Sequence, residues 1–119
     1  MVTCVSAQNS FGVTHVEAMS SVSVTQQIDA VLSDLRISAL KTGMLFSAEL
    51  IELVAHSLQS FTGSIIVDPV MVSRAGSKLL SDDAIALYQK FLFSRATLLT
   101  PNVQEAVLLS GREIVSNGC

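Results

Sequence analysis

The chain has 119 residues, of which 50% are hydrophobic and 14% are charged, with a net charge of −3 and a mean hydropathy of +0.55. The small negative charge gives no electrostatic reason to expect nucleic acid or an anionic membrane as a partner, and no apolar run approaches the roughly 20 residues of a membrane-spanning helix. One domain fits this length, and so apolar a composition favours a part of something larger.

The two cysteines, Cys4 and Cys119, form neither a disulfide framework nor a zinc-binding pattern. Such cysteine usage suits a reducing compartment. The first residues also lack the basic segment and long apolar core of a signal peptide. We therefore expect a cytoplasmic protein, or a plastid one if the source is a plant.

The chain opens on a short β-branched run at residues 2–5, followed by a loop at 6–12 and an extended arm at 13–19. Ser23 stands three residues before Gln26, the spacing of a capping box, and predicts the start of the first helix. Apolar side chains then recur at helical intervals and form one stripe. The stripe consists of Ile28, Val31, Leu32 and Leu35.

A second strand is expected at residues 37–41, before Thr42 and Gly43. Ser47 predicts the N-cap of a second helix, with Glu49 favourably placed in its positive first turn. The apolar stripe of this helix consists of Ile51, Val54, Ala55 and Leu58.

The stretch around which the chain is arranged is residues 65–71. Three consecutive β-branched residues at 65–67 predict a strand buried on both faces. Pro69 lacks an N–H and cannot extend a central strand, so Asp68 stands where the chain leaves the sheet. A carboxylate there is either a site residue or the N-cap of the next element.

A loop at residues 72–80, with Gly76 as its flexible point, precedes a third helix. Ser81 caps that helix, with two acidic residues in its first turn and an inward face of Ile85, Tyr88, Phe91 and Leu92. A last strand at 96–99 and a helix at 103–110 follow, and Gly111 suits the C′ position. This alternation predicts an α/β fold, a three-layer parallel sheet with helices on both faces, within one domain.

Polar residues follow each of the four predicted strands. Because the carboxyl ends of parallel strands share one edge and ligands bind beyond it, we expect these side chains to share a ligand. Glycine at position 43 would let that ligand approach the backbone closely. The set comprises Gln8, Asn9, Thr42, Gly43, Met44, Asp68, Thr100, Asn102 and Glu105.

Each of these residues also has a structural interpretation. Asn102 and Glu105 have the spacing of a capping box, Met44 suits a core, and Gln8 with Asn9 suits a turn. His15 and His56 stand alone, without ligand partners.

The pair Asp68 and Glu105 supplies hard oxygen ligands, which suit Mg²⁺ bound together with phosphates. Phosphoryl transfer depends mainly on positioning and charge neutralisation, and it needs such groups more than a covalent nucleophile. The sequence contains no Walker-type glycine loop, which disfavours an ordinary P-loop NTPase.

Four blocks of the sequence resemble the hydroxymethylpyrimidine and hydroxymethylpyrimidine-phosphate kinases of thiamine biosynthesis. That family belongs to the ribokinase-like superfamily and is related to pyridoxal kinases. The last two blocks would also fit pyridoxal kinases, whereas the first two favour the pyrimidine kinases. The blocks are Ala7-Gln8-Asn9 with Gly12-Val13, Lys41-Thr42-Gly43-Met44-Leu45, Val67-Asp68-Pro69-Val70-Met71, and Leu99-Thr100-Pro101-Asn102-Val103-Gln104-Glu105-Ala106.

The resemblance implies a substrate role for three residues. Gln8 would hydrogen-bond the pyrimidine ring, whose donor and acceptor edge suits an amide. Met44 and Val70 would line the apolar walls around that ring.

It also implies ATP and Mg²⁺ as cofactors. Asp68 and Glu105 would act near the magnesium-bound phosphates, directly or through water, with Asn102 on the same side. Arg74 stands where the family often has lysine, and no phosphate contact is predicted for it.

Members of the family are longer than this chain. The resemblance implies that residues 1–119 are a single partial ribokinase-like domain, without the first strand and its glycine-rich loop. It also implies that the C-terminal ATP-binding lobe is missing, with the Gly-Thr-Gly loop that forms the anion hole and carries the general base. We therefore predict a substrate and metal half-site with no catalytic residue of its own, which does not turn over alone.

Two alternatives stay open beside a kinase of thiamine synthesis. One is a pyridoxal kinase of the same superfamily, and the other is a non-catalytic α/β domain that binds a small molecule or another chain. A truncated sheet leaves unpaired edges and exposed apolar surface, which predicts a homo-oligomer or association through those edges.

Overall fold

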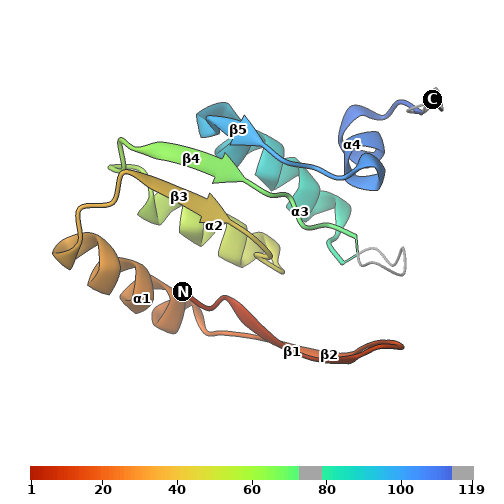
Figure 1. Cartoon of the computed structure of the whole chain (residues 1–119), viewed down its shortest axis with the longest axis horizontal. Helices are drawn as coiled ribbons and strands as arrows, with labels where there is room; N and C mark the ends of the chain where they lie inside the picture. The colour runs from red at the N-terminus through yellow and green to blue at the C-terminus, as the bar shows by residue number, and fades with distance from the viewer. Residues whose placement is uncertain (73–78, 114–119) are drawn as a thin grey trace.

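The computed structural model describes residues 1–72 and 79–113. A parallel sheet with packed helices forms the body of the molecule, and an antiparallel hairpin extends from it (Figure 1). The elements are β1 (Cys4–Asn9), β2 (Gly12–Ala18), α1 (Ser21–Asp34), β3 (Ala39–Thr42), α2 (Ala48–Ser57), β4 (Ser64–Val67), α3 (Asp82–Leu87), β5 (Leu98–Leu99) and α4 (Val103–Ser110).

The sheet has the order β3-β4-β5, and both strand pairs are parallel. The predicted parallel α/β arrangement and the central place of residues 65–67 are therefore confirmed. Helices α2 and α3, which make the two crossovers, lie together behind the sheet in Figure 1. The sequence predicted a helix layer on each face of the sheet, and the described residues contain the layer that α2 and α3 form.

The two faces of β4 differ in burial. Ile65 and Val67 are 2% and 0% exposed beneath the helices, whereas Ile66, which points to the other face, is only half-buried. On that face β3 exposes Lys41, and β5 exposes 54% of Leu98. The expectation of burial on both faces thus holds for one face of the described structure.

The first predicted strand is in a different sheet from the one expected. It extends to Asn9 and pairs antiparallel with β2, which was expected to be only an extended arm. The turn forms because the Asn9 side chain accepts hydrogen bonds from the N–H groups of Phe11 (2.9 Å) and Gly12 (3.2 Å). Gln8 and Asn9 therefore do not follow a strand of the parallel sheet, and that expectation was wrong.

Helix starts follow the predicted caps in three of four cases. The side chains of Ser47, Ser81 and Asn102 accept from the backbone N–H three residues later, at 3.2, 3.3 and 2.9 Å. The first helix begins earlier than predicted, because Ser20 accepts from Ser23 N–H and Ser23 lies inside α1. Gly111 ends α4 at φ 63°, in the left-handed conformation expected of a C-terminal glycine.

The core lies between the sheet and helices α1 to α3. The stripe of α2 is buried as predicted, whereas in α1 the buried residues are Val24 and Ile28, and Val31 and Leu35 are exposed. After α3 the chain widens into a π-helical turn at Tyr88–Leu92 and then tightens into a 3₁₀ turn at Phe93–Arg95. The fully buried side chains include Val24, Leu45, Ile51, Val54, Val67, Met71, Tyr88 and Leu92.

Among the described residues, no helix has the length and apolar character needed to cross a bilayer. The predictions for Arg74, Gly76 and Cys119 fall outside the described residues.

Candidate functional site

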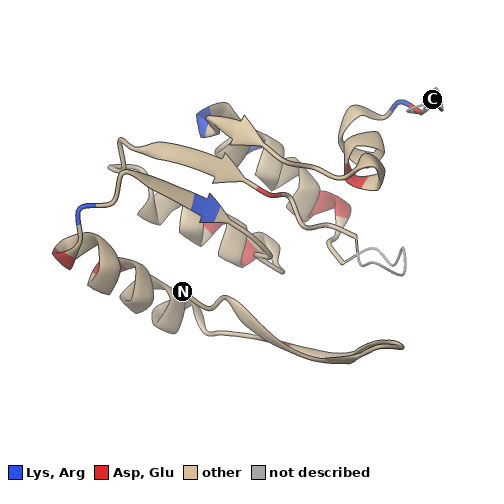
Figure 2. Ribbon diagram, in the orientation of Figure 1, with Lys and Arg blue, Asp and Glu red and all other residues tan. Residues whose placement is uncertain are grey.

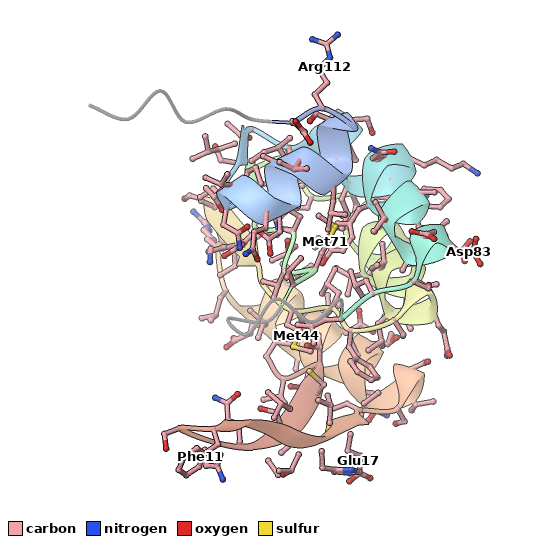
Figure 3. All side chains as sticks on the ribbon, turned by 90° about the vertical axis from the view of Figure 1, so that its right-hand side faces the viewer. Phe11, Glu17, Met44, Met71, Asp83 and Arg112 are labelled. Carbon is pink, nitrogen blue, oxygen red and sulfur yellow. The ribbon has the colours of Figure 1, made fainter. Side chains whose placement is uncertain are left out.

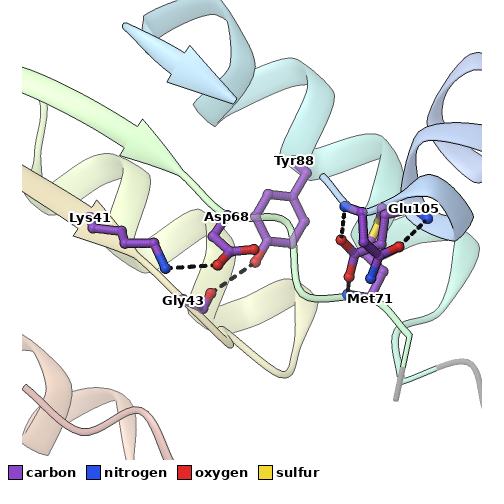
Figure 4. A network of polar contacts seen from close by, with 7 residues as sticks. Lys41, Gly43, Asp68, Met71, Tyr88 and Glu105 are labelled. Atoms are coloured by element: carbon purple, nitrogen blue, oxygen red, sulfur yellow. Dashed lines mark hydrogen bonds and ion pairs between the residues drawn. The ribbon is translucent and has the colours of Figure 1, made fainter. Parts of the chain in front are cut away.

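The carboxyl ends of β3 and β4 and the N-terminus of α4 meet at one edge of the molecule (Figure 4). We call this edge the rim and define it by Gly43, Asp68, Tyr88, Asn102 and Glu105. Asp68 follows β4 directly, Gly43 follows β3, and Glu105 lies in the first turn of α4. The side chains predicted to converge from these three elements are thus brought to one edge.

Asp68 is held at the rim by contacts to β3. Its N–H donates to the carbonyl of Thr42 at 3.2 Å, which continues the β3–β4 pairing by one residue. Its Oδ2 accepts from Lys41 Nζ at 2.7 Å in an ion pair. Helix α3 is capped by Ser81, so the alternative of Asp68 as a helix N-cap is wrong.

Glu105 uses both carboxylate oxygens to fasten two segments together. Oε2 accepts from the N–H of Asn102 at 2.9 Å, and Asn102 Oδ1 accepts from the N–H of Glu105, which completes the predicted capping box. Oε1 accepts from the N–H of Met71 at 3.1 Å. With 3% of its surface exposed, Glu105 locks the segment after β4 to the start of α4.

The donor set fits a magnesium ion at Asp68 better than at Glu105. Asp68 is 28% exposed, and its Oδ1 makes no hydrogen bond to the described residues, so one oxygen is open to a cation. Both oxygens of Glu105 already face N–H donors. The described residues contain no cluster of three or more His, Cys, Asp or Glu side chains that could hold a metal ion.

Tyr88 lies between the two carboxylates and supports the loop after β3 (Figure 4). Its hydroxyl reaches the carbonyl of Gly43 at 3.5 Å, and the backbone N–H of Leu45 donates to its oxygen. Burial raises the pKa of this phenol far above its ordinary value, and the charges of Asp68 and Glu105 add to the rise against the opposing Leu45 hydrogen bond. The sequence predicted only that Tyr88 faces inward.

Met44 sits on this loop, half-buried, and its carbonyl accepts from the Thr3 hydroxyl at 2.6 Å. At the end of this loop Phe46 has φ 67°, and the N–H of Ser47 donates to the carbonyl of Leu45. This is a tight and strained turn, which no sequence signal indicated. A Cβ added to Gly43 would meet nothing within 4 Å, so the backbone there is open to close approach.

Two of the proposed substrate residues differ in their surroundings. Val70 is half-buried in the segment after Asp68. Gln8 is exposed on the hairpin, and no hydrogen bond within the described residues links its side chain to the rim. A cavity of about 650 Å³ separates residues 1–4 and α1 from β3, and Gly43 and Met44 line it.

Solved structures identify the class of protein that has this fold. A phosphomethylpyrimidine kinase from Clostridium difficile superposes with a TM-score of 0.85 at 36% identity, over 95% of this chain and 49% of that one. A Staphylococcus aureus pyridoxal kinase in complex with AMP-PCP and pyridoxal gives 0.79 at 27% identity, over 96% and 40%. The architecture is that of the ribokinase-like kinases, as the sequence blocks predicted.

The chain belongs to the phosphomethylpyrimidine kinase family, whose model matches residues 1–118. It is 51% identical over 113 residues to the hydroxymethylpyrimidine/phosphomethylpyrimidine kinase of Synechococcus elongatus, covering 95% of this chain and 43% of that relative. The chain thus spans less than half the length of this curated relative. The resemblance seen in the sequence is confirmed.

Proposed function

We propose that the protein containing these residues transfers phosphate from ATP to hydroxymethylpyrimidine and to its monophosphate in thiamine biosynthesis. Membership of the family supports this activity. The observation that carries the proposal is the rim, where an available carboxylate, Asp68, stands beside the buried capping box of Asn102 and Glu105. We place the activity in the cytoplasm.

Asp68 is the residue that would hold Mg²⁺, which would neutralise phosphate charge during transfer. Glu105 fits a different role from the direct ligand that the sequence also allowed. Because its oxygens bind Met71 N–H and Asn102 N–H, it orients the α4 N-terminus, whose backbone N–H groups favour anions. Asn102 keeps that helix end in register through its own cap.

Gln8, Met44 and Val70 form the proposed pyrimidine side. Met44 and Val70 are both half-buried on segments that leave the parallel strands, where an apolar wall can meet a ring. Gln8 is carried by the exposed hairpin, so its contact with the ring requires the hairpin to lie over the bound substrate.

Because the chain spans less than half of the Synechococcus elongatus relative, we propose that the 119 residues do not turn over by themselves. The test is a chimera in which residues 1–118 replace the matching segment of the Synechococcus elongatus relative. We expect the chimera to phosphorylate hydroxymethylpyrimidine and the isolated chain to be inactive. Turnover by the isolated chain at a rate comparable to the chimera would refute the half-site proposal.

Substitution in the chimera assigns the metal role. Asp68→Asn removes the charge and keeps the side-chain shape, and we expect at least about a hundredfold loss of kcat/KM, the scale of a lost transition-state charge contact. Gln59→Glu, which alters an exposed residue near the end of α2, is the matched control and should leave kcat/KM unchanged. Equal rates for Asp68→Asn and the parent would exclude Asp68 from the site.

A pyridoxal kinase is the second candidate, because the two sequence blocks at residues 67–71 and 99–106 also fit that class and its structures share the fold. The two are separated by competition in the chimera. If Gln8 contacts the pyrimidine, hydroxymethylpyrimidine should outcompete pyridoxal. Gln8→Ala should then reduce this preference for hydroxymethylpyrimidine over pyridoxal. A preference for pyridoxal would favour the second candidate.

A further inference from the structure

Lys41 lies beside the rim, in contact with Asp68, and the proposed function assigns it no role. Its Nζ lies 2.7 Å from Asp68 Oδ2, while 56% of its side chain is exposed. The basic segment on β3 and the acidic one at the end of β4 lie on neighbouring strands in Figure 2. An ammonium therefore shares the carboxylate proposed for the metal.

The backbone register explains this contact. Lys41 pairs with Ile66 in the parallel β3–β4 ladder, and Asp68 follows Ile66 by two residues. Side chains two residues apart on a strand share a face, so Lys41 and Asp68 are diagonal neighbours on the face opposite α2 and α3. The lysine side chain runs along that open face toward the carboxyl end of the strands (Figure 4).

The two rim carboxylates are neutralised in different ways. Glu105 is buried, and backbone N–H groups compensate both of its oxygens. Asp68 is partly exposed, and the Lys41 ammonium is its only side-chain partner among the described residues. A flexible, exposed cation can leave its partner, whereas fixed backbone donors cannot.

We propose that Lys41 is an exchangeable counter-ion. It pairs with Asp68 in the folded chain, and it would move to a phosphate oxygen of the nucleotide when Asp68 holds a divalent cation. This inference rests on the proposed metal role of Asp68. A divalent cation and an ammonium on the same carboxylate repel each other, and phosphate oxygens bound with the metal would accept a charged hydrogen bond from the displaced ammonium.

The proposal predicts opposite effects on two ligands. In the chimera, Lys41→Met should bind Mn²⁺ alone about two- to fivefold more tightly, the scale of an exposed ion pair that no longer competes. The same variant should bind AMP-PCP with Mg²⁺ about tenfold more weakly, the scale of a lost charged hydrogen bond. Lys41→Arg keeps the charge and should stay within about twofold of the parent for both ligands.

Calorimetric titrations with Mn²⁺ and with AMP-PCP in excess Mg²⁺ measure both quantities without turnover. The matched control is Lys90→Met, which removes the same charge from a lysine lying over the Phe91 ring on the π-helical turn. This control should change neither affinity. A general effect of net charge would appear equally in both methionine variants and would overturn the proposal.

A double-mutant cycle with Asp68→Asn separates this inference from the proposed function. We expect Asp68→Asn to weaken Mn²⁺ binding at least tenfold and to abolish the tightening caused by Lys41→Met. If Asp68→Asn weakens Mn²⁺ binding but Lys41→Met leaves both affinities unchanged, the counter-ion exchange is wrong while the metal site stands. If Asp68→Asn leaves Mn²⁺ binding unchanged, both the proposed metal role of Asp68 and the counter-ion exchange of Lys41 are wrong.

Discussion

The rim and the β1–β2 hairpin carry residues proposed for the same site, yet the chain holds them in different ways. At the rim, strand pairing, a capping box and buried side chains fix each group. On the hairpin, most side chains are exposed, and Phe11 at its far end is 95% exposed (Figure 3).

This difference predicts that rim residues contribute to both stability and function, whereas hairpin residues contribute to function alone. A rim residue such as Glu105 holds two segments together, so we expect its removal to destabilise the fold and the proposed site at once. The side chain of Gln8 on the hairpin makes no hydrogen bond among the described residues, so we expect its removal to affect only the proposed substrate contact. Substitutions of graded severity test whether this division is real.

The largest effect is expected from Glu105→Ala. The substitution leaves the buried N–H of Met71 and the N–H of Asn102 without their acceptor. We expect a loss of about 3 kcal/mol in the free energy of unfolding, since each unsatisfied donor costs about 1–3 kcal/mol. Urea denaturation of the 119-residue chain measures it. Glu105→Gln keeps one side-chain oxygen as an acceptor and should lose less than half as much stability. Equal losses for the two variants would show that the hydrogen bonds to Met71 and Asn102 are not the cause.

Ionisation of Tyr88 should have a smaller effect on the free energy of unfolding, and this effect depends on pH. In the unfolded chain a tyrosine titrates near 10, and burial raises the pKa of this phenol in the folded protein. Above about pH 10 the unfolded state releases a proton that the native state keeps, so stability is complete below that pH and falls as the pH rises. The slope reaches about 1.4 kcal/mol per pH unit.

Absorbance at alkaline pH tests this directly, because the chain has one tyrosine and no tryptophan. Tyrosinate absorbance should appear only together with loss of helical circular dichroism. Tyr88→Phe should remove the tyrosine-linked part of the alkaline loss. Ionisation of Tyr88 near pH 10 in a chain that stays folded would contradict its buried place between Asp68 and Glu105.

The sequence predicted those features of the rim that depend on local signals. Ser47, Ser81 and Asn102 cap helices because the side chain and the N–H it accepts lie three residues apart in the chain. Asp68 could be placed at the end of the central strand because Pro69 stops the ladder there.

Features that depend on distant contacts could not be predicted in this way. Serine occurs at both positions 20 and 23, and only the path of the chain selects Ser20 as the cap of α1. The second contact of Glu105, with Met71, joins residues 34 apart in the sequence. The turn at Phe46 places a bulky residue at positive φ, which local preference opposes.

The hairpin should show the smallest effect on stability. We expect Phe11→Ser to change the free energy of unfolding of the 119-residue chain by less than about 0.5 kcal/mol, because an exposed side chain loses no buried area. Gln8→Ala should be equally neutral in the same urea titration. In the chimera, however, it should raise KM for hydroxymethylpyrimidine about tenfold, the scale of a lost hydrogen bond to a ligand. A stability loss from Gln8→Ala comparable to that from Glu105→Ala would mean that the hairpin is part of the folded core, and the division between the two regions would fail.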